Sequence, residues 1–362
     1  MWTRQFAVPL SQPLGTARGA IRERRGHLVA VGPSLGDGGE TRGIGEATPL
    51  PGWTESPAAC ASALASDRPA RPARAALDTL DPTATPAARH GVALALADAT
   101  ARAAECSLAS HLADGAGLPS PARSVPVNAT IGDGSPAETT TAASHAVDGG
   151  VTCLKVKVGA RSVDADVRRL QAVRDAVGSA VEVRADANGA WDLETARRAL
   201  DRLEPMDLAY VEQPLPAVEL ASTARLARES TVPIAVDESL AEHGVDAVLA
   251  ADAVDVVVLK PMALGGPDQT VDVAVRAQDA GVDPVVTTTI DAVVGRTAAV
   301  HVAAAIPDVS ACGLATAELL EDDLATDPCP VEAGRVSVPD GPGLAGDAFD
   351  ELVNSVGGHE RR

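Results

Sequence analysis

The sequence predicts an α/β protein in which an eight-stranded (β/α) barrel follows a smaller domain. Short apolar runs alternate with helix-like segments from residue 125 onwards, which is the pattern of parallel strands joined by helices. Charged residues end several of these runs and recur about 25 residues apart, the length of one strand plus one helix. The 362 residues leave room for a barrel of about 250 residues and a second domain.

The N-terminal domain is expected over residues 1–120 and combines strands with helices. Three predicted strands are separated by glycine-rich turns: 1–10, 26–32 and 41–50. Residues 56–115 are rich in alanine, and 87–113 form the clearest helix of the chain. The segment 117–126 contains three prolines, breaks the periodicity and marks the domain boundary.

The barrel is expected over residues 121–320, with strands predicted from apolar runs too continuous for half-exposed strands. These runs are 125–132, 151–159, 181–191, 208–215, 233–240, 255–266, 284–292 and 311–319. The predicted helices are 136–150, 162–178, 192–204, 219–230, 243–253, 266–281 and 295–306. The last residues, 321–362, are rich in proline and glycine and are expected to return to the first domain.

Lysine occurs only at positions 155, 157 and 260, each near the end of a predicted strand, although the chain has 30 Lys plus Arg. Arginine cannot give up its proton near neutral pH, whereas lysine can. Barrel strands are usually uncharged, so we infer that these positions need a compact or titratable cation. Lys155 and Lys157 lie two apart, so both are expected to face the barrel interior and Val156 the helices.

Three carboxylates are predicted at neighbouring strand ends: Asp186, Glu212 and Asp237. The C-terminal strand ends of a barrel converge on one mouth, where crowded carboxylates repel unless a cation is bound. A hard divalent cation with oxygen ligands suits this set, which favours Mg²⁺, with Mn²⁺ as the alternative. No His or Cys joins the set, which argues against zinc.

The lysines beside such a metal suit removal of a proton α to a carboxylate. A nearby dication lowers the pKa of an amine, so a lysine can act as the base while the metal holds the carboxylate oxygens. Lys157 is nearer the strand end and is expected to reach the substrate, with Lys155 lowering its pKa. Lys260, on the predicted sixth strand, would approach the substrate from the opposite side.

The composition predicts a cytoplasmic protein that acts on a small molecule. A net charge of −20 argues against nucleic acid or an anionic membrane as partner. No apolar run approaches 18 residues, and the first residues lack the blocks of a signal peptide. The oligomeric state stays open. The five cysteines have no metal-finger spacing and are expected to be free thiols.

The charge, the scarce lysine and the 2% aromatic residues together predict a halophilic surface. High salt screens the self-repulsion that such a charge causes at low ionic strength. A purified protein that stays folded and active without molar salt would contradict this hypothesis.

The motifs, taken in order, resemble the enolase superfamily in its muconate-lactonizing branch. The similarity lies in "LKVKVG", "RADANGAW", "VEQP", "VDES" and "LKPMALGG" and covers nearly the whole chain. It implies a modified barrel of the (β/α)7β type beneath an α+β capping domain. It also implies Lys157 as the acid/base with Lys155 beside it, and Lys260 across the substrate. The implied metal ligands are Asp186, Glu212 and Asp237, with Asn188 and Glu238 expected to support them.

The segments "KPMALGG", "VVTTTIDAVVGRTAAVHVAAA" and "CGLATAELLEDDL" are similar to o-succinylbenzoate synthases of menaquinone biosynthesis. This resemblance implies Mg²⁺-dependent syn-dehydration of a cyclohexadiene carboxylate, a hydro-lyase reaction. Lys157 would remove the α proton and return it to the departing hydroxyl, while Lys260 stays protonated and stabilises the enediolate. The residues expected to contact the ring or the succinyl chain are Thr287, Thr288, Thr289 and Gly313.

Other reactions share the same lysines and acids. N-acylamino acid racemases and dipeptide epimerases would use Lys260 as a second base. Dipeptide epimerases typically carry D-x-D at the end of the eighth strand, where this chain has "CGLAT". Muconate cycloisomerase is a further alternative. A binding protein that retains the site as a relic is the non-enzymatic one.

Overall fold

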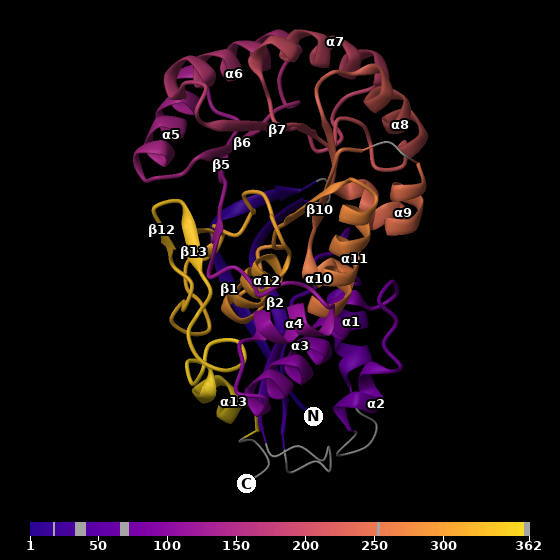
Figure 1. Ribbon diagram of the computed structural model, residues 1–362, viewed down its shortest axis with the longest axis vertical. Coiled ribbons are helices and arrows are strands. Elements are labelled where there is room, and N and C mark those ends of the chain that lie inside the picture. The colour runs from indigo at the N-terminus through magenta and orange to yellow at the C-terminus, as the bar shows by residue number, and fades with distance from the viewer. Residues whose placement is uncertain (17–18, 33–40, 66–71, 252–253, 358–362) are drawn as a thin grey trace.

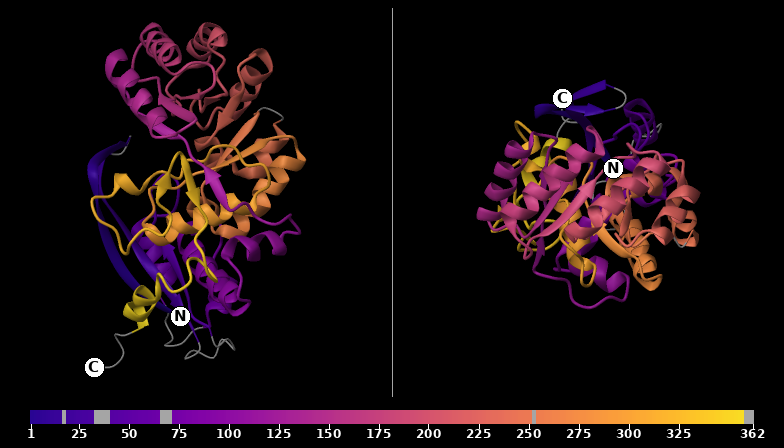
Figure 2. Two further views of the ribbon diagram at one scale, coloured as in Figure 1. Left: turned by 60° about the vertical axis from the view of Figure 1, so that its left-hand side comes forward. Right: turned by 90° about the horizontal axis from the view of Figure 1, so that it is seen from above.

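The computed structural model describes residues 1–16, 19–32, 41–65, 72–251 and 254–357. Within these ranges the chain forms an N-terminal layer of strands and helices and a curled parallel sheet with helices outside it. A C-terminal segment then lies along the N-terminal layer (Figure 1, Figure 2).

The N-terminal layer is a three-stranded antiparallel sheet covered by helices. Its strands lie in the order β1 (Trp2–Thr16), β2 (Gly19–Val31) and β3 (Gly43–Ala47). The helices are α1 (Pro57–Leu64), α2 (Ala73–Leu77), α3 (Pro86–Ala103) and α4 (Leu108–Gly115). Strand β3 lies so close to α3 that a Cβ on Gly45 would overlap the carbonyl oxygen of Gly91. The missing side chain therefore sets the spacing between sheet and helix.

The single helix predicted over 87–113 is divided into α3 and α4. Glu105 adopts a left-handed backbone with φ of 52° just after α3 ends. Ser107 begins the next helix, because its hydroxyl accepts a hydrogen bond from the N–H of Ser110 at 3.1 Å. Composition hid this break, since alanine favours helix on both sides of it.

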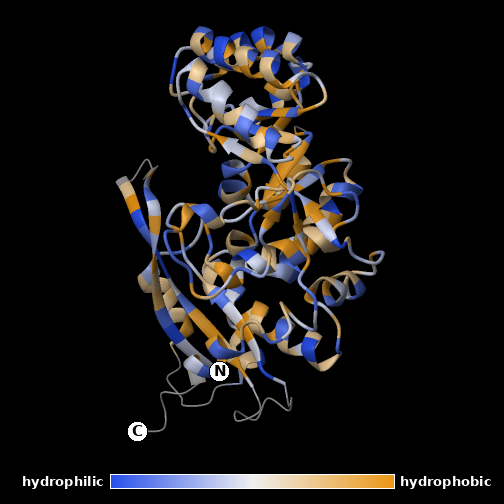
Figure 3. Cartoon of the chain, turned by 90° about the vertical axis from the view of Figure 1, so that its left-hand side faces the viewer, coloured by the Kyte–Doolittle hydropathy of each residue, from blue (hydrophilic) through white to orange (hydrophobic). Residues whose placement is uncertain are grey.

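Seven parallel strands form the curled sheet, in the order β11-β10-β9-β8-β7-β6-β5. They are β5 (Ala129–Ile131), β6 (Cys153–Lys157), β7 (Glu182–Asp186), β8 (Val211–Glu212), β9 (Ile234–Val236), β10 (Val256–Leu259) and β11 (Asp283–Val286). The accompanying helices are α5 (Pro136–Asp148), α6 (Val163–Val177), α7 (Leu193–Leu203), α8 (Leu220–Glu229), α9 (Glu238–Ala250), α10 (Pro261–Leu264), α11 (Pro267–Asp279) and α12 (Val293–Ala305). The strands are mostly buried, and the outer helices carry hydrophilic residues among apolar ones (Figure 3). The α/β barrel expected from the sequence is confirmed.

The eighth predicted strand, 311–319, contributes two bridging residues that close the ring. Cys312 pairs in parallel with Val127, just before β5, and Gly313 pairs in parallel with Thr287, just after β11. Backbone hydrogen bonds of 2.8–3.0 Å join both sides of this link. The barrel therefore consists of seven parallel strands closed by two isolated bridges at Cys312 and Gly313, because the rest of the apolar run leaves the sheet.

The C-terminal segment returns to the first part of the chain. Strands β12 (Val331–Glu332) and β13 (Arg335–Ser337) join β4 (Ser124–Pro126) in a small antiparallel sheet of order β12-β13-β4. Helix α13 (Asp350–Gly357) packs against the N-terminal sheet. One ion pair holds it there, since Nη1 of Arg102 on α3 lies 2.9 Å from Oδ1 of Asp350.

A buried carboxylate from the N-terminal sheet begins a barrel helix. Glu46 on β3 is fully buried, and its side chain accepts hydrogen bonds from the N–H groups of Ala292 at 2.8 Å and Gly295 at 2.7 Å. These donors lie at the N-terminus of α12, where a negative charge is favoured. Burial, together with the neighbouring Asp291, nevertheless raises the pKa of Glu46 to about 7.

The loop between β3 and α1 is fixed again at its far end. Glu55 accepts hydrogen bonds from the N–H groups of Ala87 at 3.0 Å and Ala88 at 2.9 Å, at the N-terminus of α3. Glu46 and Glu55 therefore anchor the two ends of this loop, one on the barrel and one on the N-terminal helices.

A buried histidine joins three parts of the chain. His301 on α12 is fully buried, and its Nδ1 accepts from the N–H of Ala109 on α4 at 3.1 Å. Its Nε2 lies 2.6 Å from the carbonyl oxygen of Leu344 and must carry the proton. The ring is thus neutral, and burial lowers its pKa to about 4.

This histidine predicts a loss of stability in mild acid. The unfolded chain takes up the proton near pH 6.5 and the folded protein only near pH 4, so protonation favours unfolding between these values. The contribution of His301 is complete above pH 6.5, and about 3 kcal/mol is lost as the pH falls to 4. The free energy of unfolding, measured by urea titration at pH 7.5, 6 and 5, should fall less steeply with decreasing pH in His301→Gln than in the wild type. The same pH dependence of stability in both proteins would contradict the lowered pKa of His301. His145→Gln, at an exposed position, is the control.

Candidate active site

The lysines and acids identified in the sequence lie at the carboxyl ends of five neighbouring strands. Lys157, the last residue of β6, is paired across the sheet with Asp186 at the end of β7. Asp186 is paired in turn with Glu212, the last residue of β8. Asp237 and Lys260 directly follow β9 and β10. The strand order therefore places these charges along one rim of the barrel.

Lys155 is shared between two carboxylates. Its Nζ lies 2.7 Å from Oε1 of Glu212 and 2.9 Å from Oδ2 of Asp186. The Nζ of Lys157 lies 2.7 Å from the same Asp186 oxygen. The side chain of Lys157 is 35% exposed and that of Lys155 is 16% exposed. Of the two lysines, Lys157 is the better placed to meet a substrate.

Asn188 connects Lys157 to the acid that follows Asp237. Its Oδ1 accepts a hydrogen bond from Nζ of Lys157 at 2.7 Å, and its Nδ2 donates to Oε1 of Glu238 at 3.1 Å. A left-handed backbone, with φ of 44°, lets its own N–H donate to Oδ1 of Asp186 at 3.0 Å. Asn188 therefore links the Lys157 side chain, which is bound to Asp186, to Glu238.

Lys260 has two partners, one of which the sequence did not reveal. Its Nζ lies 2.6 Å from Oδ2 of Asp237 and 3.0 Å from the centre of the Trp53 ring. Trp53 belongs to the loop between β3 and α1, so the N-terminal layer reaches the barrel rim here. The face of an indole ring favours a cation. The only sequence signal was the rarity of tryptophan, which occurs three times in the chain.

The rim charges shift the pKa values of the acids in opposite directions. Burial tends to raise the pKa of Asp186, but Lys155 and Lys157 lower it to about 2. Burial, and then the charge of Asp186, raises the pKa of Glu212 to about 7. Burial raises the pKa of Asp237 to about 6 although Lys260 opposes this. The acids are therefore incompletely neutralised by the lysines.

The charge of Lys155 is strongly favoured in this arrangement. Burial alone would lower the pKa of its amine, but the charges of Glu212 and Asp186 together raise it well above its usual value. A metal ion on the same acids would oppose this effect. The expected influence of Lys155 on the pKa of Lys157 stays a prediction.

Several carboxylate oxygens on the rim lack hydrogen-bond partners and are available to bind a cation. The buried Oε2 of Glu212, Oδ1 of Asp237 and Oε2 of Glu238 have no hydrogen-bond partner. Such oxygens are usually paired, and they are the ligands that Mg²⁺ prefers. Among the described residues, no three His, Cys, Asp or Glu side chains are already gathered for a metal. These residues therefore offer the oxygen ligands that would hold a hard divalent cation, whose charge would offset that of the acids.

A cavity of about 60 Å³ inside the barrel adjoins these charges. Lys155 and Glu212 line it together with Thr287 and Gly313. The Thr287 hydroxyl donates to the carbonyl of Gly313 at 2.9 Å, and a Cβ on Gly313 would overlap that hydroxyl. Thr287 and Gly313 therefore lie beside the acids, where a substrate contact was expected.

Thr288 and Thr289 are placed differently. Both are buried, and neither lines this cavity. The Thr288 hydroxyl is 3.1 Å from that of Thr316, and the Thr289 hydroxyl donates to Oδ1 of Asp291 at 2.5 Å. Because neither residue lines the cavity beside the acids, they are poorer candidates for substrate contact than Thr287.

A second cavity, of about 230 Å³, is lined by Asp237 and Lys260 of the rim. Trp53 contributes to the same wall. The remaining wall is largely apolar and includes Leu240 and Val245 of α9. This cavity suits an apolar group attached to a carboxylate that binds at the rim.

The profile of the Enolase C-terminal domain-like family matches residues 138–351, more than half of the chain. The match contains all the lysines and acids of the rim. This chain belongs to the enolase superfamily. Its membership, which the sequence motifs indicated, is confirmed, whereas Trp53 lies outside the matched region.

Curated enolase superfamily relatives of this chain catalyse different reactions. The o-succinylbenzoate synthase of Thermobifida fusca (strain YX) is 45% identical over 219 residues, 59% of this chain and 66% of that protein. The chloromuconate cycloisomerase CbnB of Cupriavidus necator is 32% identical over 269 residues, 74% of this chain and 71% of that protein. The match thus spans just under two thirds of the length of the synthase.

A solved enolase superfamily structure resembles the whole barrel and N-terminal layer. The dipeptide epimerase from Methylococcus capsulatus, complexed with Mg and the dipeptide L-Arg-D-Lys, has a TM-score of 0.81 and 28% identity. The alignment covers 95% of this chain and 97% of that one. Magnesium in such a neighbour fits the divalent cation expected on the rim.

Proposed function

We propose that this enolase superfamily member is an o-succinylbenzoate synthase of menaquinone biosynthesis. It would remove water from 2-succinyl-6-hydroxy-2,4-cyclohexadiene-1-carboxylate to give o-succinylbenzoate. The observation that carries the proposal is the placement of Lys157 and Lys260 on either side of three acids on one barrel rim. The 45% identity to the T. fusca synthase supports this choice of reaction.

Lys157 is the base in the proposed reaction and begins it as the neutral amine. The α proton of the substrate passes to Nζ of Lys157, and the C–H electron pair moves towards the carboxylate to form an enediolate. When the enediolate collapses, the bond from carbon to the hydroxyl oxygen breaks. The Lys157 ammonium group returns the proton to this oxygen, and water leaves. One lysine serves both transfers, so the elimination is syn.

Lys260 stays an ammonium group and faces the negative charge that develops on the substrate. Asp237 and the Trp53 ring both favour that charged form. The acids Asp186, Glu212 and Asp237 would hold Mg²⁺ or Mn²⁺, whose charge stabilises the enediolate oxygens. Asn188 and Glu238 support this set by orienting Lys157.

An N-acylamino acid racemase or dipeptide epimerase is the second candidate, favoured by the similarity to the M. capsulatus epimerase. There Lys157 and Lys260 would exchange the α proton from opposite faces. The ammonium group of a dipeptide needs a carboxylate partner, yet residues 311–317 contain no acid and Glu318 is exposed. Muconate cycloisomerase is the third candidate, supported by the 32% identical relative.

The proposal is tested by absorbance-monitored turnover of the cyclohexadiene carboxylate, with and without Mg²⁺. Rapid metal-dependent dehydration is expected. If folded, Mg²⁺-loaded protein does not dehydrate it, the synthase assignment is wrong, and deuterium exchange into N-acylamino acids and dipeptides tests the second candidate. In that case Lys260→Ala should abolish exchange from one substrate enantiomer only.

The expected binding partners and cellular location of the protein belong to the same proposal. A small carboxylate is the proposed partner, and nucleic acid and membranes are not expected to bind a chain with a net charge of −20. No helix in the described part of the chain is long and apolar enough to cross a membrane. The cytoplasmic location, the salt adaptation and the domain limits at 120 and 320 stay predictions.

A further inference from the structure

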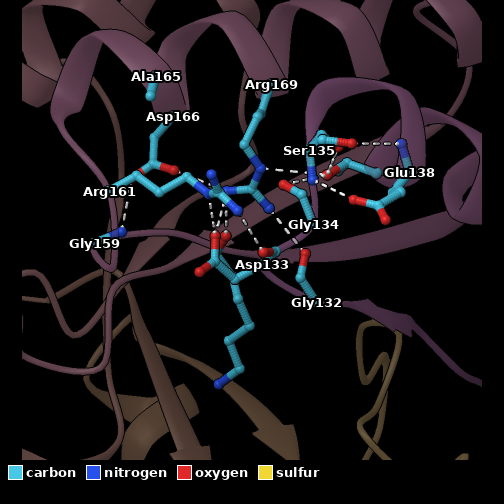
Figure 4. A network of polar contacts seen from close by, with 12 residues as sticks. Gly132, Asp133, Gly134, Ser135, Glu138, Gly159, Arg161, Ala165, Asp166 and Arg169 are labelled. Carbon is cyan, nitrogen blue, oxygen red and sulfur yellow. Dashed lines mark hydrogen bonds and ion pairs between the residues drawn. The ribbon is translucent and has the colours of Figure 1, made fainter.

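A buried arginine behind the rim holds the backbone of Lys157. Arg169 lies on α6, and its side chain is 1% exposed. Its guanidinium donates to the carbonyl oxygen of Lys157 at 3.0 Å and to the carbonyl oxygen of Gly132 at 2.8 Å. It also donates to the hydroxyl of Thr139 on α5 at 3.2 Å. One planar group thus joins the ends of β5 and β6 (Figure 4).

Asp166 completes this contact from the same helix. Its Oδ1 lies 2.8 Å from Nη1 of Arg169, and its Oδ2 accepts from the N–H of Gly159 at 2.8 Å. Gly159 has φ of 90°, a conformation that other residues rarely adopt. The backbone on both sides of Val158 is therefore bound to one buried ion pair.

The end of β5 is fixed in the same way. Oδ1 of Asp133 lies 2.7 Å from Nε of Arg161 and 3.6 Å from Nη1 of Arg169. Ser135 and Glu138 form a reciprocal capping box that begins α5 directly after this loop. Figure 4 shows Asp133 and Asp166 against the two arginines, with Ser135 and Glu138 hydrogen-bonded to each other beside them. The Arg169 cluster, meaning Arg169, Asp166 and the groups they bind, is thus a rigid support under the rim.

We propose that Arg169 is a positioning residue for proton transfer by Lys157. The inference rests on the proposed function to the extent that Lys157 must take an α proton. Proton transfer requires donor and acceptor at hydrogen-bond distance, and a displacement of about 1 Å can cost 100-fold in rate. Arg169 touches neither substrate nor metal, so its effect passes through the backbone of Lys157.

The chain offers a matched control on the same helix. Like Arg169, Arg174 donates to backbone carbonyl groups, here those of Met206 at 3.1 Å, Gly178 at 2.9 Å, Val181 at 2.6 Å and Asp207 at 2.9 Å. These acceptors lie before β7 and β8, at the opposite end of the barrel from Lys157. Arg174→Lys therefore removes a similar set of contacts without touching the rim.

The test compares Arg169→Lys with Arg174→Lys in the full-length protein. A lysine keeps the charge at position 169 but cannot reach all acceptors at once. Arg169→Lys is expected to lower kcat about 30-fold with KM within threefold, and to raise the primary isotope effect for substrate deuterated at the α carbon. Arg174→Lys is expected to lower the melting temperature similarly and to leave kcat and the isotope effect unchanged.

Hydrogen exchange separates this inference from the proposed function. Amide exchange over residues 157–162 should accelerate in Arg169→Lys and not in Arg174→Lys, whichever substrate the enzyme uses. Asp166→Asn, a milder change, should act in the same direction if Arg169→Lys does not fold. Unchanged exchange over 157–162, or equal losses of kcat in the two arginine variants, would overturn the positioning role. Absence of dehydration by the wild type, with faster exchange in the variant, would reject only the synthase assignment.

Discussion

Lys157→Ala is expected to lower turnover about 10³- to 10⁴-fold, because no other group on the rim is placed to take and return the α proton. A 10⁴-fold loss corresponds to about 5.5 kcal/mol of activation free energy. The fold should survive, since this side chain is partly exposed and Asp186 keeps Lys155 as a partner at 2.9 Å. Steady-state kinetics and a thermal melt of the same preparation measure both quantities.

An unchanged melt is essential to this result, because only then does the loss of rate report on chemistry. Arg198→Ala, which removes a largely exposed cation from α7, is the control for loss of positive charge. Turnover of Lys157→Ala within tenfold of the wild type would show that another group is the base. Lys155 would then be the first residue to replace.

Removal of divalent cations by EDTA is expected to abolish turnover, and added Mg²⁺ should restore it. Asp186, Glu212 and Asp237 place three carboxylates on one rim, and two of them have a buried oxygen without a partner. A cation that binds only the folded protein adds about 2.7 kcal/mol to the free energy of unfolding when its free concentration is 100 times its dissociation constant. For a chain of this size that is about 4 °C in melting temperature.

Potassium chloride at matched ionic strength is the necessary control, because any salt screens the self-repulsion of a chain with a net charge of −20. Glu212→Gln should reduce the specific effect of Mg²⁺ on the melt. Identical melting curves in Mg²⁺ and in matched potassium chloride would show that the rim does not bind the ion. This measurement is independent of the substrate, so it holds whichever reaction the enzyme catalyses.

Much of the barrel could be predicted from the sequence, because buried parallel strands are continuous apolar runs and helices such as α6 and α7 between them are amphipathic. The exceptions have local causes. The break at Glu105 and the irregular turn at Gly244 within α9 occur in segments whose composition favours helix on both sides. The run at 311–319 looks like its neighbours, yet only Cys312 and Gly313 pair with the sheet.

The positions of the rim residues could be predicted for a simpler reason. A charged residue at the end of an apolar run is conspicuous, and barrel topology brings such ends together. Trp53 and Arg169 could not be found this way. Each acts through a contact between distant segments, and neither interrupts a pattern that a single sequence displays.

The two glutamates that anchor the loop between β3 and α1 separate the anchorage of this loop from the residue that meets Lys260. Glu46 is held by a barrel helix and Glu55 by α3, so the anchorage of the loop does not depend on Trp53. Substitution of Trp53 changes the cavity wall beside Lys260. The loop backbone on either side of Trp53 stays in place. A change in this short segment therefore alters the surroundings of Lys260 while the charged residues of the rim and the backbone that carries them stay in place.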